Sequence, residues 1–402
     1  MKISEPIVKM HPELASWRQH IHAHPETAIE EHATAEFITT RLKELGLEVH
    51  GGIGETGMVA SLSKGSSDRI IGLRADMDAL FINEENTFDY CSKNPGKMHA
   101  CGHDGHSTML LGAARYLSEH GRFDGTVRFI FQPAEETGNE RCGGNTMVKD
   151  GLFQRYPVDC VFAMHNFPGL PVGQFAMRSG PMLASIDTFE FKVHSEFAHP
   201  AMQHETPDPL LAAARIVDAC HAFKARHINP AEPLILSITQ FQSGHPHDDK
   251  PGVHVTPDQA YVRGTVYTLN DELRETMEAG LKRIVENVAA MEGAEATFTY
   301  ERGYPVLINS EREKNLASLA AAAVVGEENV QADMQPVMGA EDFAFMLQHR
   351  PGCYVFIGNG DEAGPDGHPC HLHNPHYDFN DQAIPVGVQY FANLVERYLA
   401  TG

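Results

Sequence analysis

Short apolar runs alternate with helical patterns along the first part of the chain. Apolar residues recur at helical spacing from Glu30 to Leu45, and Gly46 follows where a helix would end. The apolar runs Ile70 to Leu73 and Val127 to Phe131 are typical of buried strands, and Ser107 to Leu117 is predicted to be a buried helix. Strands that alternate with helices favour an α/β layered domain with a largely parallel sheet.

The pattern changes near residue 184. The next elements are predicted as strand, helix, strand, strand, helix and strand, at Thr188 to His194, Pro209 to Phe223, Leu234 to Phe241, Gln259 to Tyr267, Glu272 to Met291 and Ala296 to Tyr300. This β-α-β-β-α-β order matches the split βαβ, ferredoxin-like motif. We therefore predict a small inserted domain over 184–299 and a discontinuous first domain formed by 1–183 and 300–402.

Composition places the chain among folded globular proteins. Of its 402 residues, 42% are hydrophobic and 21% are charged, which excludes a globally disordered chain. Fifty-four acidic residues against 31 basic ones give a formal charge of −23, which disfavours polyanionic partners. We therefore expect neither a nucleic-acid partner nor a membrane partner.

Targeting and redox features point to one compartment. No apolar run approaches the roughly 18 residues of a membrane-spanning helix. The segment Met1 to Met10 lacks the apolar core of a secretory signal. The seven cysteines are odd in number and include no Cys-x-x-Cys pair, as is typical of free thiols in a reducing cytosol. A cytoplasmic location is therefore expected.

Histidine is in excess, and its densest group lies in Met98 to His106. Cys101 and His103, with one glycine between them, can point into one cavity as sulfur and nitrogen ligands of a zinc-like metal. An isolated Cys-x-His pair is more often a buried thiol beside a capping residue. Three histidines, an aspartate and a thiol within this short segment favour the metal site instead.

A second histidine group lies near the N-terminus. His20, His22 and His24 alternate, and this spacing does not place all three on one helix face. We assign them a packing or capping role rather than a role in metal binding.

Further candidate ligands follow predicted strands. Glu135 and Glu136 come after one apolar strand, and His165 directly follows the strand Cys160 to Met164. Open α/β sheets bind ligands at the carboxyl ends of their strands, where one carboxylate can bind metal and its neighbour can act as a general base. Each group alone is weak evidence for a metal site, because a glutamate pair in a loop, for example, usually forms a solvated turn. Together with Cys370 to His376, these groups predict a metal site assembled from distant parts of the chain.

These segments, in this order, resemble one known family. With Gly72 to Leu80, His165 to Gly173 and Met338 to Phe343, they are similar to the amidohydrolase branch of the aminoacylase/carboxypeptidase G metallopeptidase family. That branch contains hippurate hydrolases, bacterial N-acyl-amino-acid deacylases and plant auxin-conjugate hydrolases. The resemblance covers nearly the whole chain. It implies a catalytic domain, an inserted domain that serves as lid and dimerisation surface, and a two-metal active site.

The resemblance also implies which residues hold the metals. Cys101 would bridge two divalent ions as a thiolate, Glu136 and His373 would complete one metal site, and His103 and His165 the other. Zinc, manganese, cobalt and nickel all suit a thiolate with imidazoles and carboxylates to differing degrees, so the metal stays open.

Three further roles follow from the resemblance. Glu135 would be the general base, and Asp78 would orient His103 or its metal, with a capping role for Asp78 as the alternative. His199 stands where relatives have a histidine that stabilises the oxyanion in the neighbouring subunit's active site. The resemblance therefore implies a homodimer or a higher homo-oligomer.

The chain departs from the family pattern where relatives hold the substrate's carboxylate. His254 stands where asparagine is usual, Tyr267 where arginine is frequent, and Phe81 where proline often follows Asp-Ala-Leu. We take His254 and Tyr267 as candidate substrate-binding residues. The departures leave the acyl group and the amino acid open.

Three functions are consistent with these residues. The leading hypothesis is a metal-dependent amidohydrolase that cleaves N-acyl amino acids or related small N-acyl compounds. A dipeptidase or aminopeptidase of the same family is the second. A non-catalytic binding protein of the same fold is the third, and it is disfavoured because a structural metal site has no adjacent spare carboxylate such as Glu135.

Overall fold

The computed structural model describes residues 1–244, 254–360 and 370–401. The chain forms two compact units. One comprises Met1–Met182, Leu307–Pro336 and Asp342–Gly402, and the other comprises Leu183–Val306 with Val337–Glu341. Each unit has its own buried apolar cluster. No helix among the described residues is both long enough and apolar enough to cross a membrane.

The first unit is built on an eight-stranded mixed sheet with the strand order β1-β2-β4-β3-β5-β14-β6-β13. Its strands are β1 (Glu48–Ile53), β2 (Gly57–Lys64), β3 (Ile70–Asp76), β4 (Gly125–Gln132), β5 (Cys160–Phe167), β6 (Phe175–Ala176), β13 (Val330–Gln331) and β14 (Gly352–Gly358). The four neighbours β4, β3, β5 and β14 are parallel, and β1 and β2 join them antiparallel. A separate ribbon pairs β7 (Gly180–Leu183) with β12 (Leu307–Asn309).

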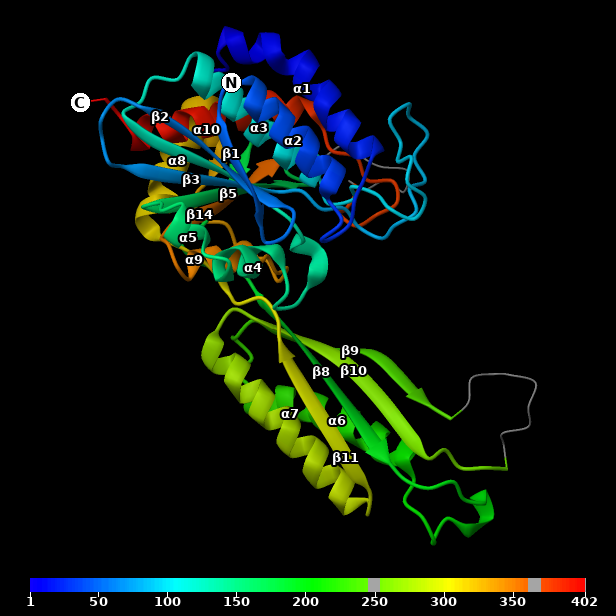
Figure 1. Cartoon of the computed structure of the whole chain (residues 1–402). Coiled ribbons are helices and arrows are strands. Elements are labelled where there is room, and N and C mark those ends of the chain that lie inside the picture. Colours follow the sequence, from blue (N-terminus) through cyan, green and yellow to red (C-terminus); the bar gives the residue numbers. More distant parts are fainter. Residues whose placement is uncertain (245–253, 361–369, 402) are drawn as a thin grey trace. The chain divides into compact units, whose positions relative to one another are not determined.

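Helices cover both faces of this sheet (Figure 1). One face carries α1 (Glu5–Ala23), α2 (His32–Glu44), α3 (His103–Glu119), α8 (Glu311–Val325) and α10 (Ile384–Tyr398). The other face carries α4 (Gly143–Lys149), α5 (Leu152–Arg155) and α9 (Phe343–Leu347). The central strands are apolar along nearly their whole length because both of their faces are covered. The predicted α/β class with a largely parallel sheet is confirmed.

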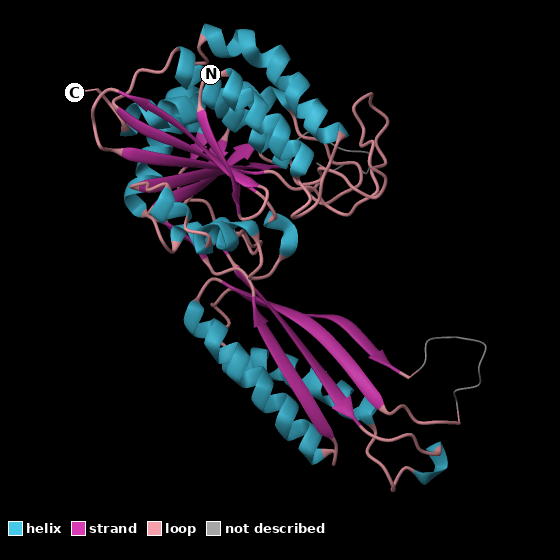
Figure 2. Cartoon of the chain, viewed as in Figure 1, coloured by secondary structure: helices cyan, strands magenta, loops and turns pink. Residues whose placement is uncertain are grey.

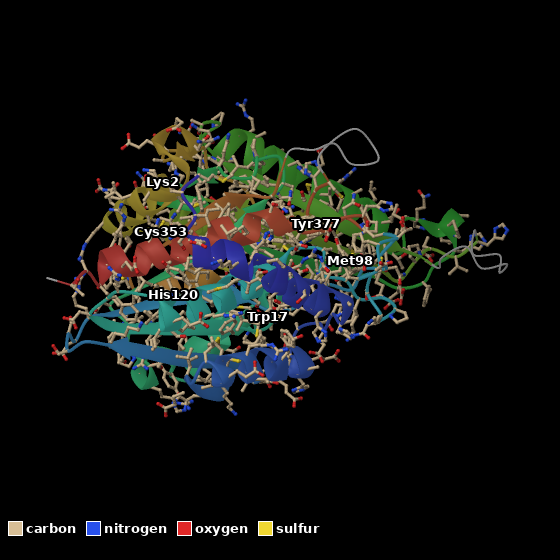
Figure 3. All side chains as sticks on the ribbon, turned by 90° about the horizontal axis from the view of Figure 1, so that it is seen from above. Lys2, Trp17, Met98, His120, Cys353 and Tyr377 are labelled. Carbon is tan, nitrogen blue, oxygen red and sulfur yellow. The ribbon has the colours of Figure 1, made fainter. Side chains whose placement is uncertain are left out.

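The packing of α3 fixes the element that leads into the candidate site. A Cβ atom added at Gly112 of α3 would lie 2.6 Å from Val388 of α10 and 2.8 Å from Leu14 of α1, so only glycine allows these helices to come so close. Trp17 of α1 and Cys353 of β14, both labelled in Figure 3, belong to the same buried cluster. The start of α3 is therefore held on a rigid core.

The second unit pairs a four-stranded antiparallel sheet with two helices (Figure 2). The elements are β8 (Ser185–His194), α6 (Pro209–His227), β9 (Leu234–Ser243), β10 (Gln259–Thr268), α7 (Asp271–Met291) and β11 (Glu295–Arg302). The strand order β11-β8-β10-β9 places the first and third strands at the centre, the arrangement of a split βαβ fold. Alternate residues of β8, including Phe189 and Phe191, are buried against the helices, which explains the period-two pattern of the sequence.

Two boundaries differ from the sequence-based expectation. Helix α3 begins at His103 rather than Ser107, because Gly102 takes a left-handed conformation (φ 92°) and turns the chain into the helix without a capping side chain. Strand β1 was not expected, because Glu48–Ile53 is an edge strand whose mostly polar and glycine residues stay solvent-accessible. The first correction places His103 and Asp104 in the first turn of α3.

A buried ionic network joins α1 to α3. His22 Nδ1 lies 2.8 Å from Asp104 Oδ2, and His22 Nε2 lies 3.1 Å from Glu84 Oε1. Burial lowers the pKa of His22, but the hydrogen bonds to Asp104 and Glu84 raise it by more, to about 9. The packing role expected for His22 is therefore a charged one at neutral pH.

This pKa predicts how stability depends on pH. Because the folded pKa of His22 lies above its unfolded value, the stabilisation is complete below about pH 6.5 and is lost as the pH rises towards about 9. The difference in unfolding free energy between wild type and His22→Gln should shrink by about 3 kcal/mol across that window. Urea unfolding at pH 6, 7.5 and 9.5 measures this difference in unfolding free energy. His120→Gln, at an exposed histidine, is the control. A wild-type minus His22→Gln difference that does not change with pH would show that His22 is not charged.

Candidate metal centre

Three neighbouring parallel strands deliver polar side chains to one edge of the first unit's sheet. Asp76 ends β3 and pairs in register with Gln132, which ends β4, and β5 on the other side of β3 carries His165 near its end. Glu135 and Glu136 follow β4 in a single 3-10 turn. The carboxyl ends of adjacent parallel strands meet at the same edge, so residues far apart in sequence come together there.

The first group of candidate ligands is fully enclosed. Cys101, His103 and His165 are buried, and their potential ligand atoms all lie within 4.8 Å of one another. Cys101 Sγ is 3.5 Å from His165 Nε2. His165 Nδ1 lies 2.7 Å from the carbonyl oxygen of Asn166, to which it donates, so the lone pair sits on Nε2 and faces the thiol. Burial lowers the pKa of His165 well below its usual value, which keeps this imidazole neutral.

The second group shares the same thiol. Cys101, Glu136 and His373 also bring one potential ligand atom each within 4.8 Å of one another. His373 Nε2 is 3.2 Å from Glu136 Oε1. The backbone N–H of His373 donates to the carbonyl of Ala100, directly before Cys101, at 2.8 Å. Two three-residue groups therefore meet at one sulfur atom.

Asp78 and Glu135 lie beside these groups. Asp78 Oδ1 is 3.2 Å from His103 Nδ1, and Asp78 Oδ2 accepts the backbone N–H of Glu136 at 2.9 Å. Asp78 thus contacts a histidine and also caps a turn, the two roles that the sequence left open. Glu135 is only 7% exposed and forms a further group within 4.8 Å with His103 and Glu136.

The electrostatics of the centre favour a cation. Burial lowers the pKa of His103, but Asp76, Asp78 and Glu136 raise it more, to about 10. Burial, followed by the negative charge of Glu136, holds the pKa of the Cys101 thiol well above its usual value. The protonated His103 therefore balances the charge of the neighbouring carboxylates, and a bound dication would take over that role and displace the protons of His103 and Cys101, because metal ligands must be deprotonated.

Unsatisfied atoms show that the residues present fit a metal. His103 Nε2 is buried and makes no hydrogen bond to any residue that the structure describes, and the buried Glu136 Oε1 lies 3.2 Å from His373 Nε2 without the geometry of a hydrogen bond. Buried polar atoms without a partner are costly and therefore rare. The thiol, imidazoles and carboxylates around them are the donor types of zinc-like ions, so a divalent cation would satisfy both atoms.

The sequence did not reveal the polar residues behind the ligand groups. His106 lies 2.6 Å from Asp76 Oδ1 through Nδ1 and 2.6 Å from Asn166 Oδ1 through Nε2. Asn166 Nδ2 donates to the hydroxyl of Tyr377 at 2.6 Å. A Cβ atom at Gly102 would lie 2.2 Å from Asn166 Oδ1, so this network also requires the glycine before His103. The aspartate two residues before Asp78 and the third histidine of Met98 to His106 were the available signals.

The remaining predicted residues belong to the second unit. His199 is exposed, and its Nδ1 accepts the backbone N–H of Ala201 at 3.1 Å. His254 is exposed and precedes the start of β10, whereas Tyr267 is half-buried near the end of that strand, opposite Ile235. The nine residues from Gln259 to Tyr267 span about 26 Å. The structure therefore does not bring Tyr267 to His254.

Known proteins resemble the chain over almost its whole length. The profile of peptidase family M20/M25/M40 matches residues 72–397. The hippurate hydrolase of Campylobacter jejuni is 35% identical over 399 residues, which cover 99% of this chain and 100% of that protein. An N-acetylcysteine deacetylase of Bacillus subtilis is 35% identical over 394 residues, 97% of this chain and 98% of that protein.

A solved structure agrees with these relatives. The crystal structure of a dinuclear metal-binding M20 peptidase from Bacillus subtilis superposes with a TM-score of 0.81 at 32% identity, covering 98% of this chain and 100% of that one. The resemblance inferred from the sequence motifs is thereby confirmed. The chain belongs to peptidase family M20/M25/M40, within its amidohydrolase branch, and is a hydrolase that acts on amide bonds.

Proposed function

We propose that the chain is a binuclear metal-dependent amidohydrolase that cleaves the amide bond of N-acyl amino acids. The sharing of Cys101 by two groups of potential ligands carries this proposal. A structural site would need one closed group and no spare carboxylate. The names of the hippurate hydrolase and the N-acetylcysteine deacetylase support an acylated amino acid as substrate.

The two groups support an assignment of the ligands. Cys101 would supply its thiolate to both ions, His103 and His165 would hold one ion, and Glu136 and His373 would hold the other. The 4.8 Å clusters, the tautomer of His165 and the unsatisfied atoms of His103 and Glu136 support this assignment. The Bacillus relative described as dinuclear supports two divalent ions. Zinc, manganese, cobalt and nickel all suit this donor set.

The chain's own residues supply the proton transfers. When bound, a pair of divalent ions polarises the amide carbonyl and lowers the pKa of water at the site. Glu135 takes a proton from the attacking water and returns it to the nitrogen of the leaving amine, so that an amide and water become a carboxylate and an amine. Asp78 holds His103 Nδ1–H and thereby directs Nε2 towards the ligand group. Burial of Glu135 keeps bulk water from competing for that proton.

The second unit supplies the remaining roles. His199 stabilises the oxyanion in the active site of a neighbouring subunit, so the working form is a homodimer or a higher homo-oligomer. His254 and Tyr267 are candidates for binding the amino-acid portion of the substrate, but a group of that size reaches only one of them within a single subunit, because they lie at opposite ends of β10. The exposed position of His199 supports a role outside the unit that carries it.

Release of free amine from a substrate panel tests the proposal. N-acetyl, N-benzoyl and N-indolylacetyl amino acids are compared with dipeptides, and N-benzoylglycine is compared with its amide, which lacks the free carboxylate. We expect the acyl amino acids to be hydrolysed, and the amide of N-benzoylglycine to be hydrolysed more slowly than N-benzoylglycine itself. Faster turnover of the dipeptides would replace the proposal by a dipeptidase, and silence on every compound would favour a non-catalytic protein.

A further inference from the structure

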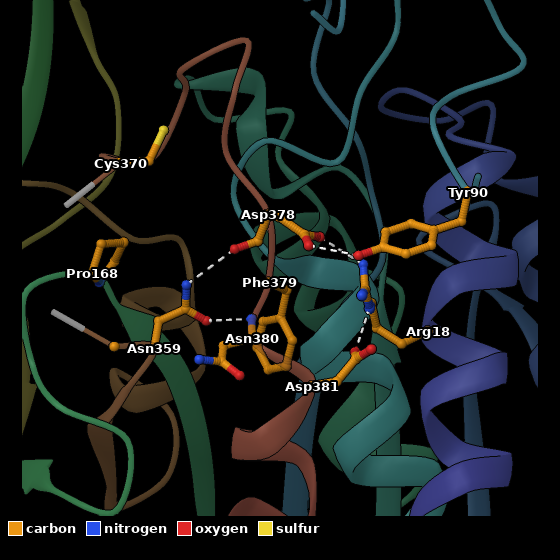
Figure 4. A pocket seen from close by; sticks show the side chains of 10 residues that line it. Arg18, Tyr90, Pro168, Asn359, Cys370, Asp378, Phe379, Asn380 and Asp381 are labelled. Carbon is orange, nitrogen blue, oxygen red and sulfur yellow. Dashed lines mark hydrogen bonds and ion pairs between the residues drawn. The ribbon is translucent and has the colours of Figure 1, made fainter. Parts of the chain in front are cut away.

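Arg18 is a buried arginine in the middle of α1 that is held by three carboxylates. Its side chain is 1% exposed. Nε donates to Asp381 Oδ1 at 2.7 Å, Nη1 donates to Asp378 Oδ1 at 2.8 Å, and Nη1 lies 3.7 Å from Asp104 Oδ2. The ring of Tyr90 lies 4.6 Å from the guanidinium carbon, and its hydroxyl donates to Asp378 Oδ2 at 2.7 Å (Figure 4).

These carboxylates belong to two of the segments that carry proposed metal ligands. Asp104 directly follows His103 in the first turn of α3. Asp378 and Asp381 follow His373 in the loop that leads into α10. The side chain of Arg18 therefore connects the segment that carries His103, a proposed ligand of one metal, to the segment that carries His373, a proposed ligand of the other.

The backbone of His373 needs such support. Its φ of 64° is a left-handed conformation that a residue other than glycine keeps only where its surroundings impose it. The hydrogen bond from His373 N–H to Ala100 holds this residue directly. Glu85 holds the next residues, because its backbone N–H donates to the carbonyl of Pro375 at 2.9 Å and its carboxylate lies 3.2 Å from His376 Nε2. Further along the loop come Tyr377, which bonds Asn166, and the two aspartates that hold Arg18.

Stability alone is a weak reason for this arrangement. Burying a cation among carboxylates costs desolvation, and apolar residues of similar volume often stabilise a fold equally well. A planar guanidinium differs from them because its donors point in fixed directions and so fix the relative position of two carboxylates. Arg18 suits a role that depends on geometry.

We propose that Arg18 is a positioning residue that fixes the His373 loop against the start of α3. It would thereby keep the metal bound that Glu136 and His373 hold. This inference rests on the proposed ligand assignment. Arg18 contacts none of the proposed ligands itself, and it acts through Asp104, Asp378 and Asp381. Loss of a direct partner of a metal ligand typically costs 10–100-fold in metal affinity, and for Arg18, which lies at least one contact further back, we expect the lower end of that range.

The test compares Arg18→Lys with Arg274→Lys. Lysine keeps the charge, but one ammonium cannot reproduce the fork between Asp378 and Asp381. Arg274 is the matched control, because in the second unit it makes a buried two-point contact with Asp187 at 2.8 and 2.5 Å. The cavity of about 300 Å³ beside Arg18 leaves room for the new side chain.

The readout is metal retention, measured by competition with a chelator and by elemental analysis of the folded proteins. We expect Arg18→Lys to hold one ion as wild type does and to lose the ion at Glu136 and His373 about tenfold more readily, with kcat lowered more than KM is raised. Arg274→Lys should keep both ions. A folded Arg18→Lys protein with both wild-type affinities would overturn the inference.

A second variant separates positioning from stability. Arg18→Met combined with Asp378→Asn and Asp381→Asn removes the guanidinium together with the two carboxylates of the fork, while Asp104 keeps its partner His22, so the protein should fold even if the single variant does not. Weak binding of one ion in this folded variant supports positioning, whereas wild-type binding assigns Arg18 to stability alone. A wild type that itself binds fewer than two ions would defeat the proposed function, which is a separate result.

Discussion

Replacing Glu135 with glutamine is expected to lower kcat by about 10²–10⁴-fold, the range over which general acid–base catalysis contributes. The amide has nearly the same shape as the carboxylate but cannot take a proton from water. Glu135 lies in one group with His103 and Glu136, close enough to serve a reaction at the ligand cluster. In free energy the loss corresponds to about 3–5 kcal/mol of the barrier.

Metal content separates this effect from damage to the site. Because Glu135 is not among the proposed ligands, Glu135→Gln should keep both ions and the wild-type melting temperature. Glu140→Gln, which makes the same charge change at an exposed position five residues along, should keep wild-type turnover. Steady-state kinetics and elemental analysis of wild type and the two variants test this prediction. A kcat of Glu135→Gln within threefold of the wild-type value would show that Glu135 is not the general base.

Replacing Cys101 with alanine should remove the shared ligand and cost more than about 100-fold in metal affinity, since even groups behind the ligands cost 10–100-fold. The loss should affect both ions, because Cys101 belongs to both ligand groups. Turnover should fall in parallel with metal content. This pattern differs from that of Glu135→Gln, which keeps the metals and loses the reaction.

Cys353→Ala is the matched control for the thiol. Cys353 is also buried, in β14 of the same unit, and its thiol lies 3.5 Å from the carbonyl of Tyr354. That variant should bind both ions as wild type does. If Cys101→Ala also retains two ions at wild-type affinity, the bridging assignment is wrong.

Sequence patterns predicted much of the fold because burial alternates with the period of each element. The β-α-β-β-α-β order and the largely parallel sheet both came from such periodicity. Edge strand β1 was not predicted, because its mostly polar and glycine residues give no pattern of apolar positions. The start of α3 was predicted too late in the chain, because Gly102 turns the chain into the helix through its backbone conformation and without a capping side chain.

Candidate site residues were visible where a strand end or a helix start marked them. His103, Glu135 and His165 stand at or near such positions, whereas Asp78 was identified only through the family resemblance. The network behind them was not visible, because Asn166 and Tyr377 meet across 211 residues of sequence. Arg18 was missed for a related reason. An arginine in an amphipathic helix usually faces solvent, and only the tertiary structure supplies the three carboxylates that bury it.

Titration of the chelator-treated wild-type enzyme with single metals tests the central claim most directly. Hydrolysis of the preferred N-acyl amino acid is followed while bound metal per chain is measured in the same samples. We predict no turnover without metal and a rise that reaches its plateau near two ions per chain. Full turnover in protein stripped of metal, or a plateau at one ion, would contradict a binuclear centre bridged by Cys101.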